Sequence, residues 1–231
     1  MIVELGVLAM LGAVCGLDVV SFPQAALSRP LIAATLAGAL LGDATAGLVT
    51  GAVLELFASE TLPFGASRYP EWGSSSVVAG GAAAVGAAAG TLPLALCVAV
   101  PIGLGLAAFG GWTMVKLREW NARLAAARLE NLARGHARTV MGLQVAGATA
   151  DMLRGGAIAL VGATIALPLA RWFAPQPEPW AAWVVPVLAG LGGAVAGGAS
   201  WKMYHSTPRT QPWGAAGLAI GIALVVLLAR R

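Results

Sequence analysis

The sequence predicts an all-α, polytopic integral membrane protein. Of its 231 residues, 58% are hydrophobic and only 10% are charged, whereas about a quarter of the residues in a soluble domain are charged. The mean hydropathy is +0.81. The 31 glycines suit membrane helices, whose interfaces tolerate glycine far better than soluble helices do. We therefore expect Gly-rich transmembrane helices, with some segments re-entrant or broken.

The distribution of charge and the two cysteines argue against several classes of protein. The net charge is +4, but the cations lie mainly in residues 116–138 and the aromatic residues are few, which indicates a membrane orientation and not nucleic-acid binding. Cys15 and Cys97 stand in apolar segments without the spacing of a metal site or a disulfide framework. His136 lies among arginines and His205 lies alone, so neither is expected to be catalytic. We expect no cofactor, no metal and no catalytic residue in this chain.

The N-terminal segment is predicted to be the first membrane helix. Its apolar run of about twenty residues carries Glu4 and Asp18, and it lacks the basic start and the cleavage signal of a removable signal peptide. The next ten residues, SFPQAALSRP, contain Pro23 and Pro30. Because two prolines frame this short polar stretch, we expect a shaped bend that re-enters the membrane.

Between residues 31 and 59 the chain is apolar but carries two carboxylates. Asp43, Gly47, Gly51 and Glu55 recur every four residues. On one continuous helix they would form a single narrow face, with about 18 Å between the acids. A carboxylate at the bilayer centre costs about 2.5 to 3.5 kcal/mol, and no basic residue lies within the stretch. We interpret the glycines as packing contacts and the acids as marks of a site.

A break at Asp43 is the alternative to a continuous helix. The sequence LLGDATAG has the features of a helix end followed by a turn and a new capped helix. Both halves would then be short. The stretch would become a hairpin that has to be buried in protein.

The segment ETLPFGASRYPEWGSSS, which begins at Glu60, is too polar to lie in lipid and too rich in Pro and Gly for a regular helix. Tyr69 and Trp72 give it stacking surface. These rings can serve as anchors at the membrane interface, or the segment can close over a ligand. Both interpretations remain open at this point.

The rest of the chain is predicted to form long apolar helices. As a single helix, residues 77–115 would be about 58 Å long, well beyond the hydrocarbon thickness of about 30 Å, so we expect two elements hinged near residues 89–93. Residues 116–138 are predicted to be an amphipathic helix with a basic face, which the positive-inside rule assigns to the cytoplasm. A phosphoprotein or anionic lipid could dock there, but a plain solvated face is favoured. Further apolar segments follow at 140–173, 180–201 and 213–228.

One ion pair is predicted within these later segments. Asp151 and Arg154 are one helical turn apart, so they can neutralise each other inside the bilayer. Gln144 lies on roughly the same side of the helix. We favour a self-compensating structural pair over a functional one.

Residues 16–73 resemble the membrane IIC subunit of the mannose/fructose/sorbose family of bacterial sugar phosphotransferase systems. The resemblance is carried by RPL at Arg29–Leu31, by the pattern LxGxxLGDxxxGLxxGAxLEL from Leu36 to Leu56, and by the Gly65-Ala66 pair. The remainder is similar more loosely, and the whole chain, 1–231, is expected to form one membrane-embedded domain. After Gly65-Ala66 this chain has SRYPEW, where the better-known mannose members have small residues. This departure bears on which sugar is carried.

The resemblance implies a transport subunit that is not an enzyme by itself. Such a subunit pairs with a second membrane subunit, IID, in a hetero-oligomer in the bacterial cytoplasmic membrane, and a cytoplasmic IIB, charged by IIA, phosphorylates the hexose as it is released. By resemblance, the sugar contacts are Glu55, with Gln24, Asp43, Gly65 and Ala66 as further candidates.

Five other residues receive structural or gating roles from the same resemblance: Arg29, Pro30, Gly42, Gly47 and Gly51. The residue chemistry is consistent with a sugar ligand, because a carboxylate accepts strong hydrogen bonds from adjacent hydroxyls and a carboxamide both donates and accepts. Glycine contacts between rigid helical units also suit the sliding that alternating access requires.

Two other functions are compatible with the residues. One is a proton-coupled secondary transporter that uses Asp43, Glu55 or Asp151 as a relay. The other is a membrane scaffold whose acids hold a partner subunit. Neighbouring genes for IIA, IIB and IID would favour the phosphotransferase subunit over both.

Overall fold

The computed structural model describes residues 1–18, 21, 23–60 and 68–205, with six residues of the C-terminal segment. The described ranges are helical and contain no strand, which confirms the all-α fold class. The helices are α1 (Ile2–Asp18), α2 (Pro30–Leu40), α3 (Ala44–Ala58), α4 (Trp72–Ala89), α5 (Leu92–Ala126), α6 (Leu129–Ala133), α7 (Ala137–Phe173), the 3-10 helix η1 (Ala181–Trp183) and α8 (Val184–Tyr204).

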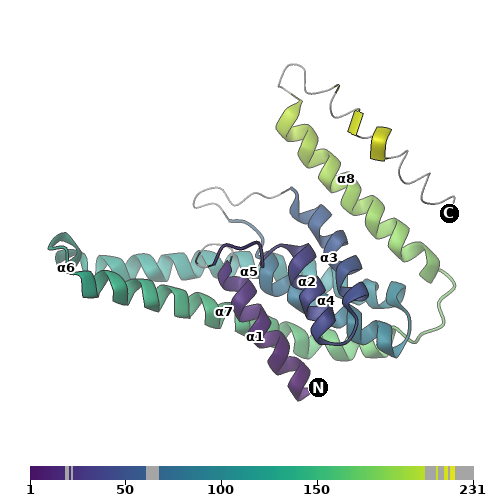
Figure 1. Cartoon of the computed structure of the whole chain (residues 1–231), viewed down its shortest axis with the longest axis horizontal. Helices are drawn as coiled ribbons and strands as arrows, with labels where there is room; N and C mark the ends of the chain where they lie inside the picture. The colour runs from purple at the N-terminus through teal and green to yellow at the C-terminus, as the bar shows by residue number, and fades with distance from the viewer. Residues whose placement is uncertain are drawn as a thin grey trace.

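Helix α4 is the centre of the bundle (Figure 1). It contacts α1, α2, α3, α5 and α7, and every residue from Gly73 to Gly86 is buried. Its sequence consists almost entirely of Gly, Ala, Ser and Val, so neighbouring backbones can approach closely on every side. The predicted division near residues 89–93 is confirmed, because α4 ends at Ala89 and α5 begins at Leu92.

Helices α2 and α3 form a hairpin, so the continuous helix over residues 31–59 is wrong and the alternative break at Asp43 is confirmed. Gly42 has φ +98°, a left-handed conformation that glycine adopts without steric cost. The next residue, Asp43, caps α3 by accepting a hydrogen bond from the Ala46 N–H at 2.9 Å. The two helices are about 16 and 22 Å long at the ideal rise. Neither is therefore long enough to cross a bilayer by itself.

The hairpin closes on glycines. A Cβ at Gly51 would lie 2.7 Å from the Pro30 carbonyl oxygen and 2.8 Å from the Leu31 Cα, and one at Gly47 would meet the backbone of Ala34. Backbone atoms cannot swing aside as a flexible side chain can. Any larger residue at these positions therefore has to push α2 and α3 apart.

We expect Gly51→Ala to lower the free energy of unfolding by about 1 to 3 kcal/mol, the usual cost of overpacking. Gly105→Ala is the matched control, because Gly105 also lies within a helix but has open space where its Cβ would be. Both substitutions gain the same helix propensity. SDS titration in mixed micelles measures the difference, and equal stabilities of the two variants would show that the hairpin can expand freely.

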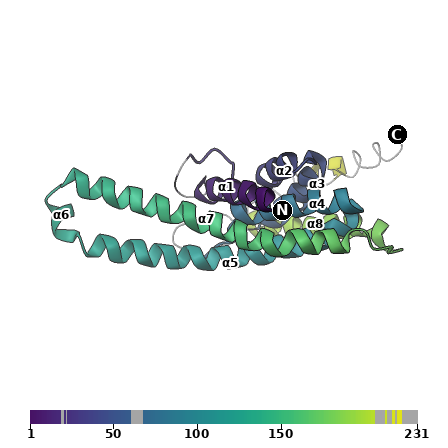
Figure 2. The ribbon, with the colours of Figure 1, turned by 90° about the horizontal axis from the view of Figure 1, so that it is seen from below.

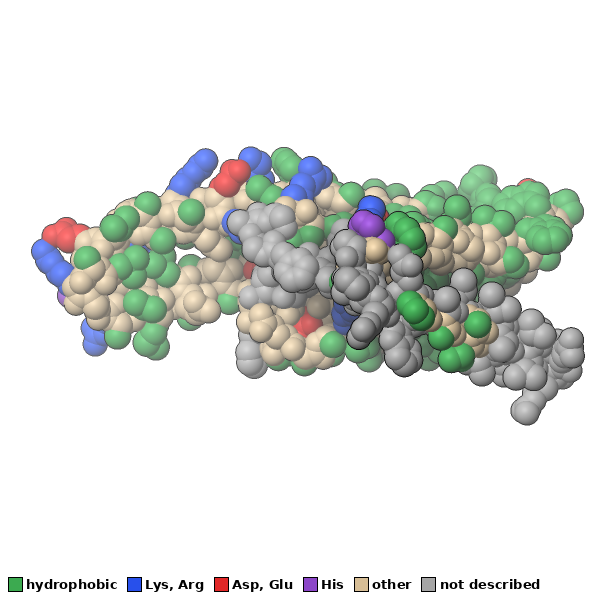
Figure 3. Space-filling model, turned by 90° about the horizontal axis from the view of Figure 1, so that it is seen from above, with side chains coloured by type: hydrophobic (Ala, Val, Ile, Leu, Met, Phe, Trp, Pro, Cys, Tyr) green, Lys and Arg blue, Asp and Glu red, His purple; other side chains and the backbone are tan. Residues whose placement is uncertain are grey.

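Helices α5 and α7 run side by side and extend beyond the other helices, with α6 at the far end (Figures 1 and 2). They contain 35 and 37 residues and are about 52 and 55 Å long. We refer to the part formed by residues 116–147 as the arm. In Figure 3 the Lys and Arg side chains lie over the arm and the middle of the molecule, whereas the end opposite the arm is mostly hydrophobic where it is coloured.

The single amphipathic helix predicted for residues 116–138 is wrong. This stretch forms the end of α5, all of α6 and the start of α7. Gly135 has φ +71°, and the hydrogen bonds Gly135 N–H to Leu132 O and His136 N–H to Asn131 O, at 3.0 and 3.1 Å, form a Schellman motif that ends α6. The apolar periodicity continues through the turn, so it does not reveal where the chain reverses.

Among the residues that the structure describes, three helical segments are long and apolar enough to cross a membrane, by length and composition: Leu92–Ala126, Ala137–Phe173 and Ala181–Met203. Within the last of these, α8 packs mainly on α3 and leaves most of its surface exposed. The predicted segment 213–228 lies largely outside the described residues. These helices agree with a multi-pass membrane protein.

Candidate functional site

Charged side chains from five parts of the chain lie where the arm leaves the bundle. We refer to this group as the polar layer; it consists of Asp18, Arg29, Glu55, Glu71, Asp151 and Arg154. They come from α1, the bend after it, α3, the start of α4, and α7. Each of them takes part in hydrogen bonds or ion pairs, which are described below.

Asp18 organises the bend between α1 and α2. The side chain is 2% exposed and accepts hydrogen bonds from the Ala25 N–H at 2.7 Å and from the N–H and hydroxyl of Ser28, both at 2.9 Å. Within this bend Gln24 and Ala26 have φ of 57° and 63°, left-handed conformations that cost a non-glycine residue about 1 to 2 kcal/mol each. The buried carboxylate therefore offsets backbone strain.

Arg29 and Glu55 form an ion pair at the open end of the hairpin. The guanidinium lies 2.5 Å from Glu55 Oε1, and the Leu31 N–H donates to Glu55 Oε2 at 3.1 Å. No basic residue within 31–59 could neutralise the charge of Glu55. The hairpin, however, places the Arg29 guanidinium beside the Glu55 carboxylate. The Glu55 side chain is 24% exposed and that of Arg29 is 55% exposed, so a ligand can reach both groups.

The other sequence-predicted contacts lie at different places. Gln24 is exposed on the same bend as Arg29. Asp43 is at the opposite end of α3 from Glu55, in the hairpin turn, so the structure does not bring these two acids together. Gly65 and Ala66 lie outside the described residues. Pro30 is the first residue of α2, a position that suits its fixed φ and missing N–H.

Glu71 is a buried acid for which the sequence pattern predicted no role. The residue is fully buried and caps α4, accepting hydrogen bonds from the Ser74 N–H at 3.1 Å and the Ser74 hydroxyl at 2.5 Å. Its own N–H donates to the Ala107 carbonyl at 2.8 Å. The available signal was an acid immediately before the WGSSS run and the uninterrupted apolar segment that follows it, because such a residue is a frequent N-cap.

The side chain of Tyr69 is buried and contacts a residue of the arm. Tyr69 is 7% exposed, and the Arg118 guanidinium lies over its ring, 5.0 Å from the centroid. The ring is thus used in a cation–π contact that attaches the segment before α4 to the arm. It is not available as an exposed interfacial anchor.

The predicted pairing of Asp151 with Arg154 is confirmed. Arg154 donates from Nε and Nη2 to Asp151 Oδ1 at 2.9 and 2.8 Å, and the side chains are 2% and 9% exposed. The Ser21 hydroxyl donates to Asp151 Oδ2 at 3.2 Å, and a longer contact of 3.4 Å joins Arg154 to the Thr113 hydroxyl. This pair therefore ties α7 both to α5 and to the bend that follows α1.

The polar layer combines hydrogen-bond acceptors and donors in a membrane protein, without a cluster suited to a metal. Among the described residues no three His, Cys, Asp or Glu side chains are arranged to hold a metal ion. A partly exposed carboxylate beside a guanidinium can instead accept from and donate to neighbouring hydroxyl groups. The arrangement can thus bind a polar, uncharged molecule by hydrogen bonds.

Comparison with known proteins identifies both a family and a similar solved structure. Residues 2–198 match the family described as the sorbose-specific IIC component of the PTS system. A solved structure titled "Structure of membrane protein" superposes with a TM-score of 0.71 at 19% sequence identity, and the alignment covers 100% of this chain and 96% of that one. At this identity the second match shows a shared fold. A search among curated proteins finds no match.

Proposed function

Because this chain belongs to the family of sorbose-specific IIC components of the sugar phosphotransferase system, we propose that it binds a hexose and moves it inward for phosphorylation by IIB. The family makes it a membrane-embedded transport subunit with a sugar substrate and phosphotransferase partners. The hexose, the direction of movement and the individual partners are parts of the proposal.

The Arg29–Glu55 pair is the observation that carries the proposal. Glu55 is partly exposed, and its carboxylate keeps acceptor capacity beyond the bonds from Arg29 and Leu31. Adjacent hydroxyls of a pyranose can share such a carboxylate, while the guanidinium donates to a ring or hydroxyl oxygen. Gln24, on the same bend, is the proposed second contact, since its carboxamide both donates and accepts.

We assign structural roles to the hairpin residues. Gly42 and Asp43 form the turn and the helix cap, and Gly47 and Gly51 allow the two short helices to touch. Movement of this hairpin as a unit would carry Glu55 and Pro30 together. Gly65 and Ala66 remain proposed contacts on the strength of the family resemblance alone.

Charge supports an orientation with the arm in the cytoplasm of a bacterial cell. The arm carries six Lys or Arg residues against two Glu residues between positions 116 and 138, the excess that cytoplasmic segments of membrane proteins have. We propose that IIB, charged by IIA, receives the sugar on this side. The IID subunit would complete the translocator within the cytoplasmic membrane.

The test is co-purification with the IID candidate, followed by calorimetric titration with mannose, fructose, sorbose and N-acetylated hexosamines. We expect Glu55→Gln to weaken binding of the accepted sugar about 10- to 100-fold, because a charge-assisted hydrogen bond contributes about 1.5 to 3 kcal/mol. Glu60→Gln is the matched control. Glu60 lies just beyond the same end of α3 but is paired with Lys202 at 2.9 Å.

Each outcome has a definite meaning. Unchanged affinity in Glu55→Gln removes Glu55 from the site, and equal losses in both variants indicate a general effect of removing charge. Uptake driven by a proton gradient without IIA and IIB would instead support a secondary transporter.

A further inference from the structure

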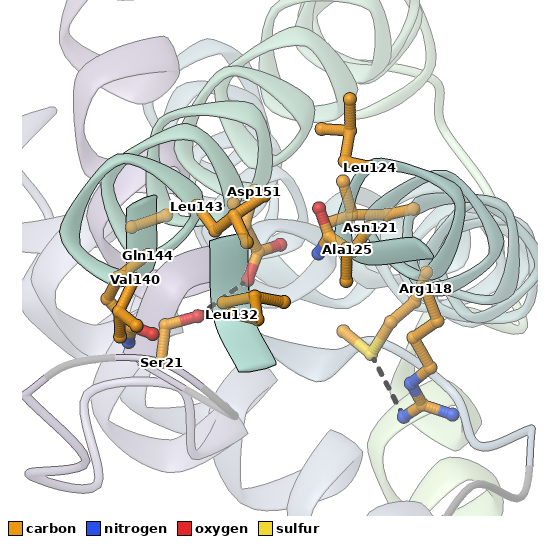
Figure 4. Close-up of a pocket in the computed structure, with 14 residues that line it drawn as sticks. Ser21, Arg118, Asn121, Leu124, Ala125, Leu132, Val140, Leu143, Gln144 and Asp151 are labelled. Atoms are coloured by element: carbon orange, nitrogen blue, oxygen red, sulfur yellow. Dashed lines mark hydrogen bonds between the residues drawn. The ribbon is translucent and has the colours of Figure 1, made fainter. Parts of the chain in front are cut away.

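A cavity of about 350 Å³ lies between α5 and α7 and extends along the arm from its base, at Asp151, to Leu132 of α6, and the Arg29–Glu55 pair takes no part in its lining. Figure 4 shows Asn121 of α5 and Asp151 of α7 facing each other across it, with Leu132 of α6 between the two helices. Ser21 lies beside Asp151, to which it is hydrogen-bonded. The volume is within the range of small-molecule sites, which begins at about 300 Å³.

The polar groups of this arm cavity suit an uncharged ligand. The Asp151 carboxylate is neutralised by Arg154 at 2.8 Å, so it can accept hydrogen bonds without demanding a cation. Arg118 also lines the cavity, but its guanidinium lies over the Tyr69 ring. The Asp151–Arg154 pair thus adds no net charge to the wall, and the one other charged group among the described residues of the lining is directed at an aromatic ring.

Two carboxamides are available to such a ligand. Asn121 and Gln144 line the cavity from opposite helices, and within the described ranges no hydrogen bond is formed by either carboxamide. Each can donate two hydrogen bonds and accept two, which matches hydroxyl groups that also do both. The remaining wall is largely aliphatic, including Leu117 and Leu143, and suits the C–H face of a ring.

The place of the cavity suggests when it would be occupied. Ser21 belongs to the bend whose far end carries Arg29, so one short segment touches both the cavity and the Glu55 pair. The cavity also lies within the basic arm, on the side that charge assigns to the cytoplasm. A sugar released from Glu55 toward that side would meet the cavity before leaving the protein.

We propose that the arm cavity is a second binding site for a neutral polyhydroxylated molecule, and that it holds the transported hexose before IIB phosphorylates it. The neutral, hydroxyl-rich class follows from the cavity's own groups. Only the identification of that ligand as the transported hexose rests on the proposed function.

A cysteine reporter tests the proposal in the full chain, co-purified with IID where that complex forms. Ala148→Cys places a thiol on the cavity wall, and Thr149→Cys places one on the exposed surface one residue away as the matched control. Cys15 and Cys97 are replaced by Ala in both. The rate of maleimide alkylation is measured against the concentration of each hexose, of the corresponding hexose 6-phosphate and of a short-chain alkyl maltoside.

We expect one hexose to slow alkylation of Ala148→Cys saturably and to leave Thr149→Cys unchanged. The protection should persist when Glu55→Gln is added. It should require an about 10- to 30-fold higher hexose concentration in Asn121→Leu/Gln144→Leu, because two hydrogen bonds of about 1 kcal/mol each are removed.

The contrary outcomes separate this proposal from the previous one. If no hexose protects Ala148→Cys, or if the double leucine variant is protected equally well, the second sugar site is wrong. Protection by the maltoside alone would identify an amphiphile site, and stronger protection by the 6-phosphate than by the hexose would contradict a neutral ligand. Failure of Glu55→Gln to affect calorimetric binding removes Glu55 from the sugar site but leaves the cavity proposal standing. Should the double variant fail to fold, the two cysteine reporters still decide the matter.

Discussion

Asp151→Ala is expected to lower the free energy of unfolding by about 3 to 5 kcal/mol, because it leaves the Arg154 guanidinium buried without its counter-charge. Arg154 is only 9% exposed, and its remaining contacts are with neutral oxygens of Gly110 and Thr113 at 3.5 and 3.4 Å. Neither oxygen can replace a carboxylate. SDS titration of the purified protein in mixed micelles measures the loss.

The double variant Asp151→Leu/Arg154→Leu provides the control. Removing both charges together avoids an unpaired buried ion, and such replacements are often neutral or stabilising. We therefore expect the double variant to be more stable than Asp151→Ala. If the single and double variants were equally unstable, the loss would come from packing and not from the unpaired charge.

Asp18→Ala is expected to cost about 2 to 4 kcal/mol, since the bend between α1 and α2 loses its carboxylate acceptor. Three hydrogen bonds from Ala25 and Ser28 end on this side chain, and they hold two non-glycine residues at positive φ. Without them the bend can relax to ordinary backbone conformations. Arg29 lies at the end of the bend, so sugar binding at Glu55 should weaken in the same variant.

Asp18→Asn separates the roles of shape and charge. An asparagine keeps one acceptor oxygen in nearly the same place, so it should recover part of the stability and of the sugar affinity. Limited proteolysis of the bend reports its order directly. Wild-type affinity in Asp18→Ala would mean that the bend does not position Arg29.

The candidate site was only partly predictable from residue patterns. Glu55 stood out because a carboxylate in an apolar stretch is costly, and Asp151 with Arg154 because they are one turn apart. Arg29 was expected to have a structural or gating role, but its pairing with Glu55 depends on the α2–α3 hairpin turning back on itself. Asp18 and Glu71 were seen as charges in or near apolar segments, yet their hydrogen bonds are with backbone and serine groups that spacing alone does not identify.

Local chemistry by itself determined the membrane class, the helical fold and the signals for the helix breaks at residues 42–43 and 90–91. Low charge and high glycine content are properties of the composition of the chain. Gly42, Asp43 and Gly-Thr at 90–91 are turn and cap signals that can be recognised within a few residues. The family pattern in residues 16–73 is local in the same sense. These features need no distant partner.

Only the tertiary structure decided how the charges are compensated and where cavities form. Both depend on contacts between residues far apart in sequence, such as Ser21 with Asp151 and Arg29 with Glu55. The reversal at Gly135 also had to be seen in space, because apolar periodicity continues across it, and that reversal brings Asn121 opposite Gln144. A periodic pattern specifies which face of a helix is apolar, but not which helix will lie against it.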